Sequence, residues 1–146
     1  FWSIAFPGFG QLLNGQLLKG FVFIALEFLV NAQSHFNKVI LLSFHGEIQK
    51  AIQQTNYQWL MFYPCLYFFA MWDAYKEAEG ETTRYTFLPF VFSAFFVTVG
   101  LIFSPHLKIM GVLWGPVWLP MSCVIPGVGI GLLLKYVFSK LNTVNG

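Results

Sequence analysis

Residues 7–20 read PGFGQLLNGQLLKG and lead directly into the apolar segment FVFIAL at 21–26. Four glycines within fourteen residues remove side chains that would keep another backbone at a distance. The amide and ammonium groups between them need polar partners, which hydrocarbon cannot supply. They belong to Gln11, Asn14, Gln16 and Lys19. The stretch therefore predicts the polar mouth of a transmembrane helix, placed beside protein, water or lipid headgroups.

The composition of the chain is typical of a membrane protein. Of the 146 residues, 57% are hydrophobic, 20% are aromatic and only 10% are charged, and the mean hydropathy is +0.64. Soluble domains carry roughly 25% charged residues. The length leaves room for about three to five spans of about 20 residues each. We therefore expect residues 1–146 to form a single transmembrane domain.

The net charge of +2 is spread along the chain without a run of lysine or arginine. This pattern indicates neither nucleic-acid binding nor a polybasic lipid-binding tail. Cys65 and Cys123 fall inside predicted spans and are interpreted as small buried hydrophobic residues. No cysteine-histidine spacing resembles a metal site, and no cofactor is expected. The expected partners are membrane lipids and other membrane protein subunits, or further copies of this chain.

The first span is predicted from about residue 16 to residue 30 or slightly beyond. Its polar and small positions fall within about a 60° arc of the helix. They are Gln16, Gly20, Glu27, Asn31 and Ser34. A carboxylate at membrane depth costs about 2.5–3.5 kcal/mol and persists where it faces a partner or a wet cavity. We expect Glu27 to point inward, as an ion or proton site or, the interpretation we favour, as a hydrogen-bonded carboxyl that joins helices or lies near the outer interface.

Residues 35–54 are predicted to form one amphipathic helix. Apolar side chains recur every four residues, and the charged and amide side chains point in other directions. The apolar positions are Phe36, Ile40, Phe44, Ile48 and Ile52. Because its charges make this segment a poor span, we expect it to lie on the membrane surface.

The second span is predicted over 57–75. Tyr57 and Trp59 stand at one end, and Trp72 and Tyr75 at the other, so the two aromatic belts are about 27 Å apart. Pro64 lies between them and predicts a kink, because it removes one backbone hydrogen bond.

A third span is predicted over 87–104. Ser93, Gly100 and Ser104 share one face of this helix. Small residues on one face let two helix backbones approach closely. The pattern therefore predicts a helix-packing surface.

Residues 109–138 are apolar and contain the last predicted span. Pro116, Pro120, Pro126 and Gly127, with other glycines, predict that this helix is broken, most strongly at 126–127. Because each half is too short to cross the bilayer comfortably, we expect one kinked span, with a re-entrant hairpin as the alternative. The predicted fold is thus all-α: a membrane bundle of about four transmembrane helices plus one amphipathic interfacial helix.

The distribution of positive residues predicts the orientation. With four spans, five of them fall on one side and three on the other. The first group is Lys19, Lys76, Arg84, Lys135 and Lys140, and the second is Lys38, Lys50 and Lys108. Because cytoplasmic loops carry the excess of lysine and arginine, both termini are predicted to be cytoplasmic.

This topology places residues 7–20 and the end of the second span at the same membrane surface. Asp73 then has available partners in Lys19 and in the amides of Gln11 and Asn14. We therefore predict a cytoplasmic polar cluster of these four residues.

The pattern PG-x-GQ-x-x-NG-x-x-x-KG at 7–20, followed after a second span by DAY at 73–75, resembles small bacterial multi-pass membrane proteins. These proteins are distantly similar to the two-transmembrane-helix domain family. The resemblance covers about residues 6–78 and implies a helical topology in the bacterial cell membrane. The chain departs from the family at 35–56, where a long insert replaces a short loop.

The chain lacks the sequence signatures of common enzymes. A nucleophile elbow, paired intramembrane aspartates, a His-Glu-x-x-His motif and a phosphate-cradling loop before a helix are absent from the sequence. We assign no catalytic residue, and a lipid-modifying activity at Glu27 or His106 is a minor hypothesis. We expect a membrane protein that acts by binding, as a small subunit or assembly factor of a membrane complex or homo-oligomer. The alternative is an ion or small-solute channel or transporter that uses the polar stripe around Glu27.

Overall fold

The computed structural model describes residues 6–79 and 85–144, so Arg84 lies outside the described residues. The described chain is helical apart from one two-stranded hairpin, which confirms the all-helical prediction. The elements are α2 (Phe9–Leu13), α3 (Leu17–Ser34), α4 (Phe36–Phe44), α5 (Ile48–Gln54), α6 (Tyr57–Leu60), α7 (Phe62–Glu79), α8 (Leu88–Phe103), β1 (Lys108–Ile109), β2 (Val112–Leu113) and α9 (Gly115–Val144).

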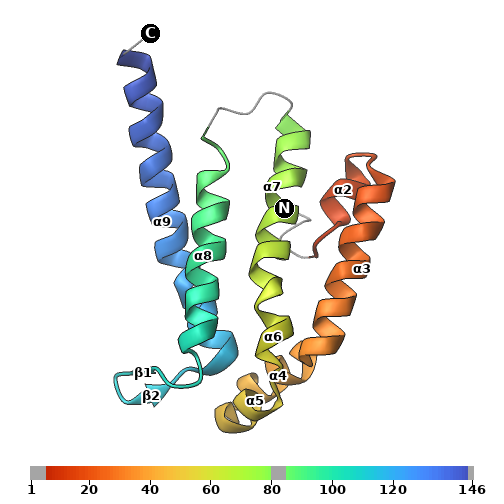
Figure 1. Cartoon of the computed structure of the whole chain (residues 1–146), viewed down its shortest axis with the longest axis vertical. Coiled ribbons are helices and arrows are strands. Elements are labelled where there is room, and N and C mark those ends of the chain that lie inside the picture. The colour runs from red at the N-terminus through yellow and green to blue at the C-terminus, as the bar shows by residue number, and fades with distance from the viewer. Residues whose placement is uncertain (1–5, 80–84, 145–146) are drawn as a thin grey trace.

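The four long helices of the described chain lie side by side in the order α9, α8, α7 and α3 (Figure 1). Each packs against its neighbour in this row: α3 against α7, α7 against α8, and α8 against α9. The turn between α2 and α3, the last turn of α7, the start of α8 and the last turns of α9 lie at one end, which we call the loop end (Figure 1). The short helices α4 and α5 and the β1–β2 hairpin lie at the opposite end, which we call the base.

Two helices in the described part of the chain are long and apolar enough to cross a membrane. They are Leu17–Ser34 and Gly115–Leu141, with mean hydropathies of 1.4 and 2.0. α8 is also apolar but has 16 residues. By length and composition, these helices indicate membrane association.

The α2–α3 hairpin explains two of the glycines in the 7–20 stretch. Gly8 has a φ of +96°, and a Cβ placed there would lie 2.6 Å from the carbonyl oxygen of Gly20. Gly15 has a φ of +77° and forms the turn. Gly8 therefore admits the backbone of α3, and Gly15 supplies the left-handed turn by which α2 folds back onto α3.

The prediction of a single amphipathic helix over 35–54 is wrong. The chain turns between α4 and α5 at Gly46, which has a φ of +78°. The buried residues of the two helices are Val39, Ser43 and Ala51. Phe36 and Ile40 of the predicted apolar face pack against this core, whereas Phe44 is 61% exposed. Val39 and Ala51 pack against Val117 at the start of α9 and close the base of the molecule.

The second predicted span is divided into α6 and α7 at Met61. Pro64 follows three residues later and has no N–H to donate to the carbonyl of Leu60, which is the last residue of α6. The interruption therefore lies where the kink was predicted.

The predicted break in the last span is also wrong. α9 continues through Pro120, Pro126 and Gly127 as one helix of 30 residues, and Pro116 lies in its first turn. A proline leaves one carbonyl without its usual partner, whereas a full break in apolar surroundings would leave several backbone groups unpaired. The segment is nevertheless a single helix, as expected, and not a re-entrant hairpin. The predicted start of this span, at 109–113, instead lies in the β1–β2 hairpin.

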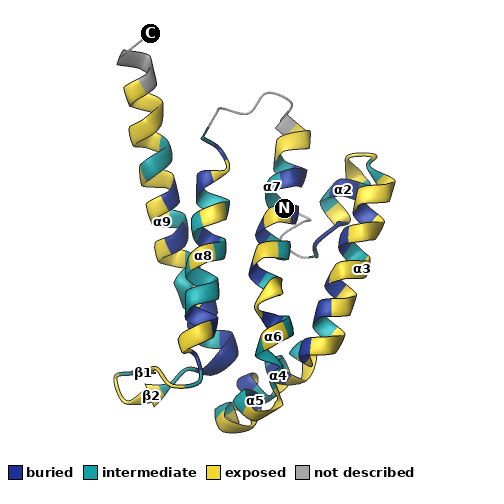
Figure 2. Cartoon of the chain, in the orientation of Figure 1, coloured by how far each residue is buried: buried dark blue, intermediate teal, exposed yellow. Residues whose placement is uncertain are grey.

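The small residues predicted on the third span are all buried. Ser93 and Ser104 are 1% and 0% exposed. A Cβ at Gly100 would lie 2.8 Å from the Sγ of Cys123, so this part of the face meets α9 closely. Ser104 also shares a hydrogen bond of 3.2 Å with the hydroxyl of Tyr57. Figure 2 shows this burial along α8, in contrast to the exposed outer surfaces of the row.

Candidate functional site

The structure brings Gln11 and Lys19 to the carboxylate of Asp73. Gln11 Nε2 donates to Asp73 Oδ2 at 3.1 Å and to the carbonyl oxygen of Ala70 at 2.8 Å. Lys19 Nζ lies 3.2 Å from Asp73 Oδ1. Gln11 is fully buried and Asp73 is 9% exposed. These contacts attach the α2–α3 hairpin to the last turns of α7.

Two further contacts extend this polar cluster along α7. Asn14 Nδ2 donates to the carbonyl oxygen of Ala74 at 2.9 Å, so Asn14 contacts the backbone beside Asp73 rather than its carboxylate. Lys19 Nζ also lies 3.4 Å from Glu77 Oε1. Glu77 was missed by the sequence analysis, although its spacing of four residues from Asp73 places both on one helix face.

Glu77 lies beyond the 57–75 segment that is predicted to cross the membrane. A hydrogen bond from Gln16, followed by one from Lys19, lowers the pKa of Glu77 below its ordinary value. At neutral pH, Glu77 is therefore ionised when it contacts Gln16 and Lys19. Ionised Glu77 therefore stabilises the folded state at pH values above its unfolded pKa. This stabilisation is lost as the pH falls through the lowered pKa of the folded state.

The cluster contains two buried amide oxygens that accept no hydrogen bond from the part of the chain that the structure describes. Within the described residues, Gln11 Oε1 and Gln16 Oε1 are buried and have no hydrogen-bond partner. The charged groups of the cluster, by contrast, are paired, because Lys19 contacts both Asp73 and Glu77. This arrangement is suited to joining helices, because each ionised group already has an opposite charge or an amide beside it.

The predicted polar stripe of α3 is divided among three environments. Gln16 belongs to the polar cluster, and a Cβ at Gly20 would meet the side chain of Leu12. Glu27 is 4% exposed and accepts a hydrogen bond of 3.2 Å from the hydroxyl of Tyr63 on α7.

Asn31 lies at the far end of the stripe and has a local role. Its Nδ2 donates to Asn37 Oδ1 at 3.2 Å, and its Oδ1 accepts from the backbone N–H of Asn37 at 3.3 Å. These bonds stabilise the turn at His35, where the φ is +57°. The stripe therefore forms separate contacts along α3.

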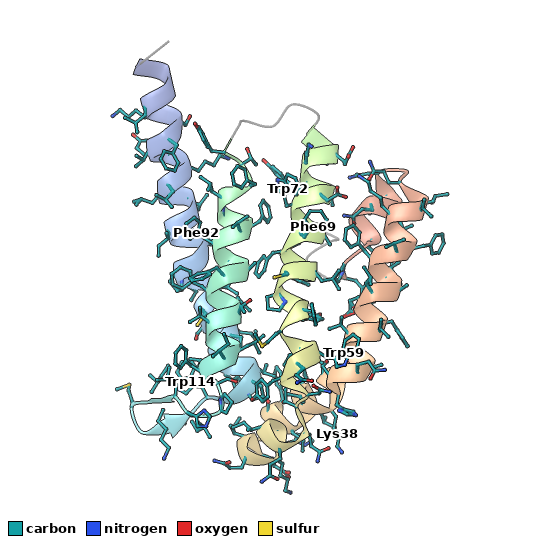
Figure 3. All side chains as sticks on the ribbon, viewed as in Figure 1. Lys38, Trp59, Phe69, Trp72, Phe92 and Trp114 are labelled. Carbon is teal, nitrogen blue, oxygen red and sulfur yellow. The ribbon has the colours of Figure 1, made fainter. Side chains whose placement is uncertain are left out.

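A lateral groove of about 930 Å³ lies between α7 and α8. Aromatic and aliphatic side chains form most of its lining, among them Phe69 and Trp72 of α7, which are labelled in Figure 3. Cys65 also lines the groove and is exposed, so its interpretation as a buried residue is wrong. Sequence periodicity did not reveal this groove, because it depends on the distance between two helices.

Within residues 6–79 and 85–144, no three histidine, cysteine or acidic side chains are grouped to hold a metal ion. Cys65 and Cys123 are both free thiols. His106 is exposed after the end of α8.

Comparisons with protein-family models, with curated proteins and with solved structures gave no match. The resemblance of residues 6–78 to the two-transmembrane-helix domain family therefore stays a prediction.

Proposed function

We propose that this protein is a four-span integral membrane protein of the bacterial cell membrane that acts by binding other membrane proteins. It would serve as a small subunit or assembly factor of a membrane complex, or as a homo-oligomer. The proposed spans are α3, residues 57–75 of α6 and α7, α8, and residues 115–138 of α9. α4 and α5 would lie at the membrane surface on the base side.

The observation that carries this proposal is the open row of helices. α3 and α9 stand at the two ends of the row (Figure 1), so the four long helices do not close on themselves, and the short helix α2 packs beside α3 and α7. Large apolar side chains are exposed on each helix, for example Phe28 at 73%, Phe95 at 60% and Ile125 at 76%. Apolar surfaces of this extent are typical of contact with lipid or with another protein.

The positions of tryptophans support insertion along the long axis. Trp59 and Trp114 lie toward the base and Trp72 lies toward the loop end (Figure 3). Tryptophan is enriched at both membrane–water interfaces. The base and the loop end would therefore be the two membrane surfaces.

Binding to other membrane proteins is tested by purification from native membranes in mild detergent. We expect the protein to elute as a homo-oligomer or with a stoichiometric membrane partner, identified by mass spectrometry. Elution as a monomer alone, at every protein concentration and in two unrelated mild detergents, would contradict the proposal.

The topology predicts opposite labelling of two single-cysteine variants. In a Cys65→Ala, Cys123→Ala background, Gln49→Cys places a thiol at the base and Ser139→Cys places one near the loop end. A membrane-impermeant maleimide should label Gln49→Cys in right-side-out vesicles and Ser139→Cys in inverted vesicles. Labelling of both variants from the same side would rule out the four-span arrangement with cytoplasmic termini.

The buried carboxyl of Glu27 favours a second candidate function, an ion or small-solute channel or transporter. Tyr63 holds this carboxyl between α3 and α7. A glutamine there retains an oxygen that accepts from Tyr63 but removes the titratable charge. If Glu27 only joins helices, Glu27→Gln should unfold near the wild-type temperature and leave proteoliposome flux unchanged. A wild-type flux that Glu27→Gln abolishes would favour the transport function instead.

A further inference from the structure

We propose that the groove between α7 and α8 binds an acyl chain of one anionic phospholipid, whose headgroup lies at Lys76. This inference rests on the proposed membrane insertion and names a specific lipid-binding site within it. The groove, its length and the position of one cation each support this ligand.

The lining of the groove is suited to an acyl chain. Phe69 and Trp72 of α7 face Phe90, Val91 and Ala94 of α8 across the groove. The volume of about 930 Å³ lies within the range of about 300–1,000 Å³ that is common for small-ligand sites.

The length of the groove distinguishes a lipid chain from a partner helix. On α8 and its N-cap residue the lining extends from Phe87 to Thr98. Eleven helical steps of 1.5 Å span about 16 Å, which is close to half of a hydrocarbon core of about 30 Å. A transmembrane partner helix needs a contact surface across both leaflets. An acyl chain reaches from the interface to the midplane and matches the groove.

A cation stands at the interfacial end of the groove. Lys76 follows Trp72 by one helical turn, on the α7 face that also carries Phe69. Its Nζ lies 5.5 Å from the centre of the Trp72 ring. The neighbouring carboxylates of Asp73 and Glu77 both contact Lys19 on the side of α3. Lys76 is therefore placed to contact a headgroup phosphate, with its methylene stem along the aromatic ring.

Native mass spectrometry of the full chain tests this site. The protein would be reconstituted in equal amounts of phosphatidylglycerol and phosphatidylcholine and released in mild detergent. We expect the wild type to retain one phosphatidylglycerol molecule. Ala94→Trp, which fills the groove, should lose this lipid, whereas Ala32→Trp on an exposed position of α3 should retain it.

The headgroup contact has its own variant. Lys76→Gln should lower the preference for phosphatidylglycerol over phosphatidylcholine about fivefold, while the groove still holds a chain. Lys108→Gln removes an exposed lysine at the base and should leave the preference unchanged. Because Lys76 is exposed, this variant remains informative even where Ala94→Trp fails to fold.

Several results would overturn the lipid site. They are retention of the lipid by Ala94→Trp at the wild-type level, equal loss by Ala32→Trp, an unchanged preference in Lys76→Gln, and occupation of the groove by a second copy of the chain. Labelling of the Gln49→Cys and Ser139→Cys variants tests membrane insertion separately from the lipid site. Correct labelling without a retained lipid removes the lipid site alone, and incorrect labelling removes both proposals.

Discussion

Replacing Gly131 with alanine is expected to lower the free energy of unfolding by about 1–3 kcal/mol. A Cβ at this position would meet the Cα of Pro89 and lie 2.8 Å from the backbone nitrogen of Pro89. Gly127→Ala should act in the same direction, because its Cβ would lie 2.7 Å from the Cα of Ser93. In both cases the obstructing atoms are backbone, so the added methyl group must push α8 and α9 apart.

Gly129 provides a matched control on the same helix. A Cβ at this position has no described atom within 4 Å, and its φ does not require glycine. Gly129→Ala is therefore expected to stabilise the helix by about 0.5–1 kcal/mol. Thermal unfolding in mild detergent should rank Gly129→Ala above the wild type and Gly131→Ala below it. Equal effects of the three substitutions would show that α8 and α9 do not pack as described.

These glycines show why the last span was mispredicted. A proline followed by glycine is a common signal for the end of a helix, and Pro126-Gly127 was interpreted in this way. Gly127 and Gly131 also lie four residues apart on one face, where they admit the backbone of α8. A proline-glycine pair that ends a helix and one that lies on a helix-packing surface have the same composition. Only the position of a neighbouring helix distinguishes them.

The same reasoning explains the error at 35–54. A repeat of four residues predicted one continuous apolar face, but Gly46 with a φ of +78° separates two short helices. The two helices therefore pack separately, with Val39 of α4 and Ala51 of α5 buried and Phe44 at the end of α4 exposed. Gly46 inside the amphipathic pattern indicated this turn, but the repeat of four residues was given more weight than the glycine.

The polar cluster was more accessible to prediction because polar groups at one membrane depth have few available partners. Shared depth suggested that Asp73 meets Gln11 and Lys19, and the structure has both contacts. The α7–α8 groove had no comparable signal. Its existence depends on the spacing of two helices, which no residue type in the sequence specifies.

Asp73→Ala is expected to lower the free energy of unfolding by about 2–3 kcal/mol. The substitution removes a nearly buried charged acceptor of Gln11, whose amide is fully buried and keeps only its bond to the Ala70 carbonyl within the cluster. Asp73→Asn retains an acceptor oxygen and should have a smaller effect. Thermal or denaturant unfolding in the same mild detergent measures both variants.

A double-mutant cycle with Gln11→Ala and Asp73→Ala isolates the contact itself. Because a hydrogen bond to a charged group contributes about 1.5–3 kcal/mol, the coupling should fall in this range. Glu77→Gln is the matched control, since Glu77 lies one turn further along α7 and its side chain is 37% exposed. Solvent screening should leave Glu77→Gln close to the wild type. A coupling near zero between Gln11 and Asp73 would show that the α2–α3 hairpin is held to α7 by apolar packing instead.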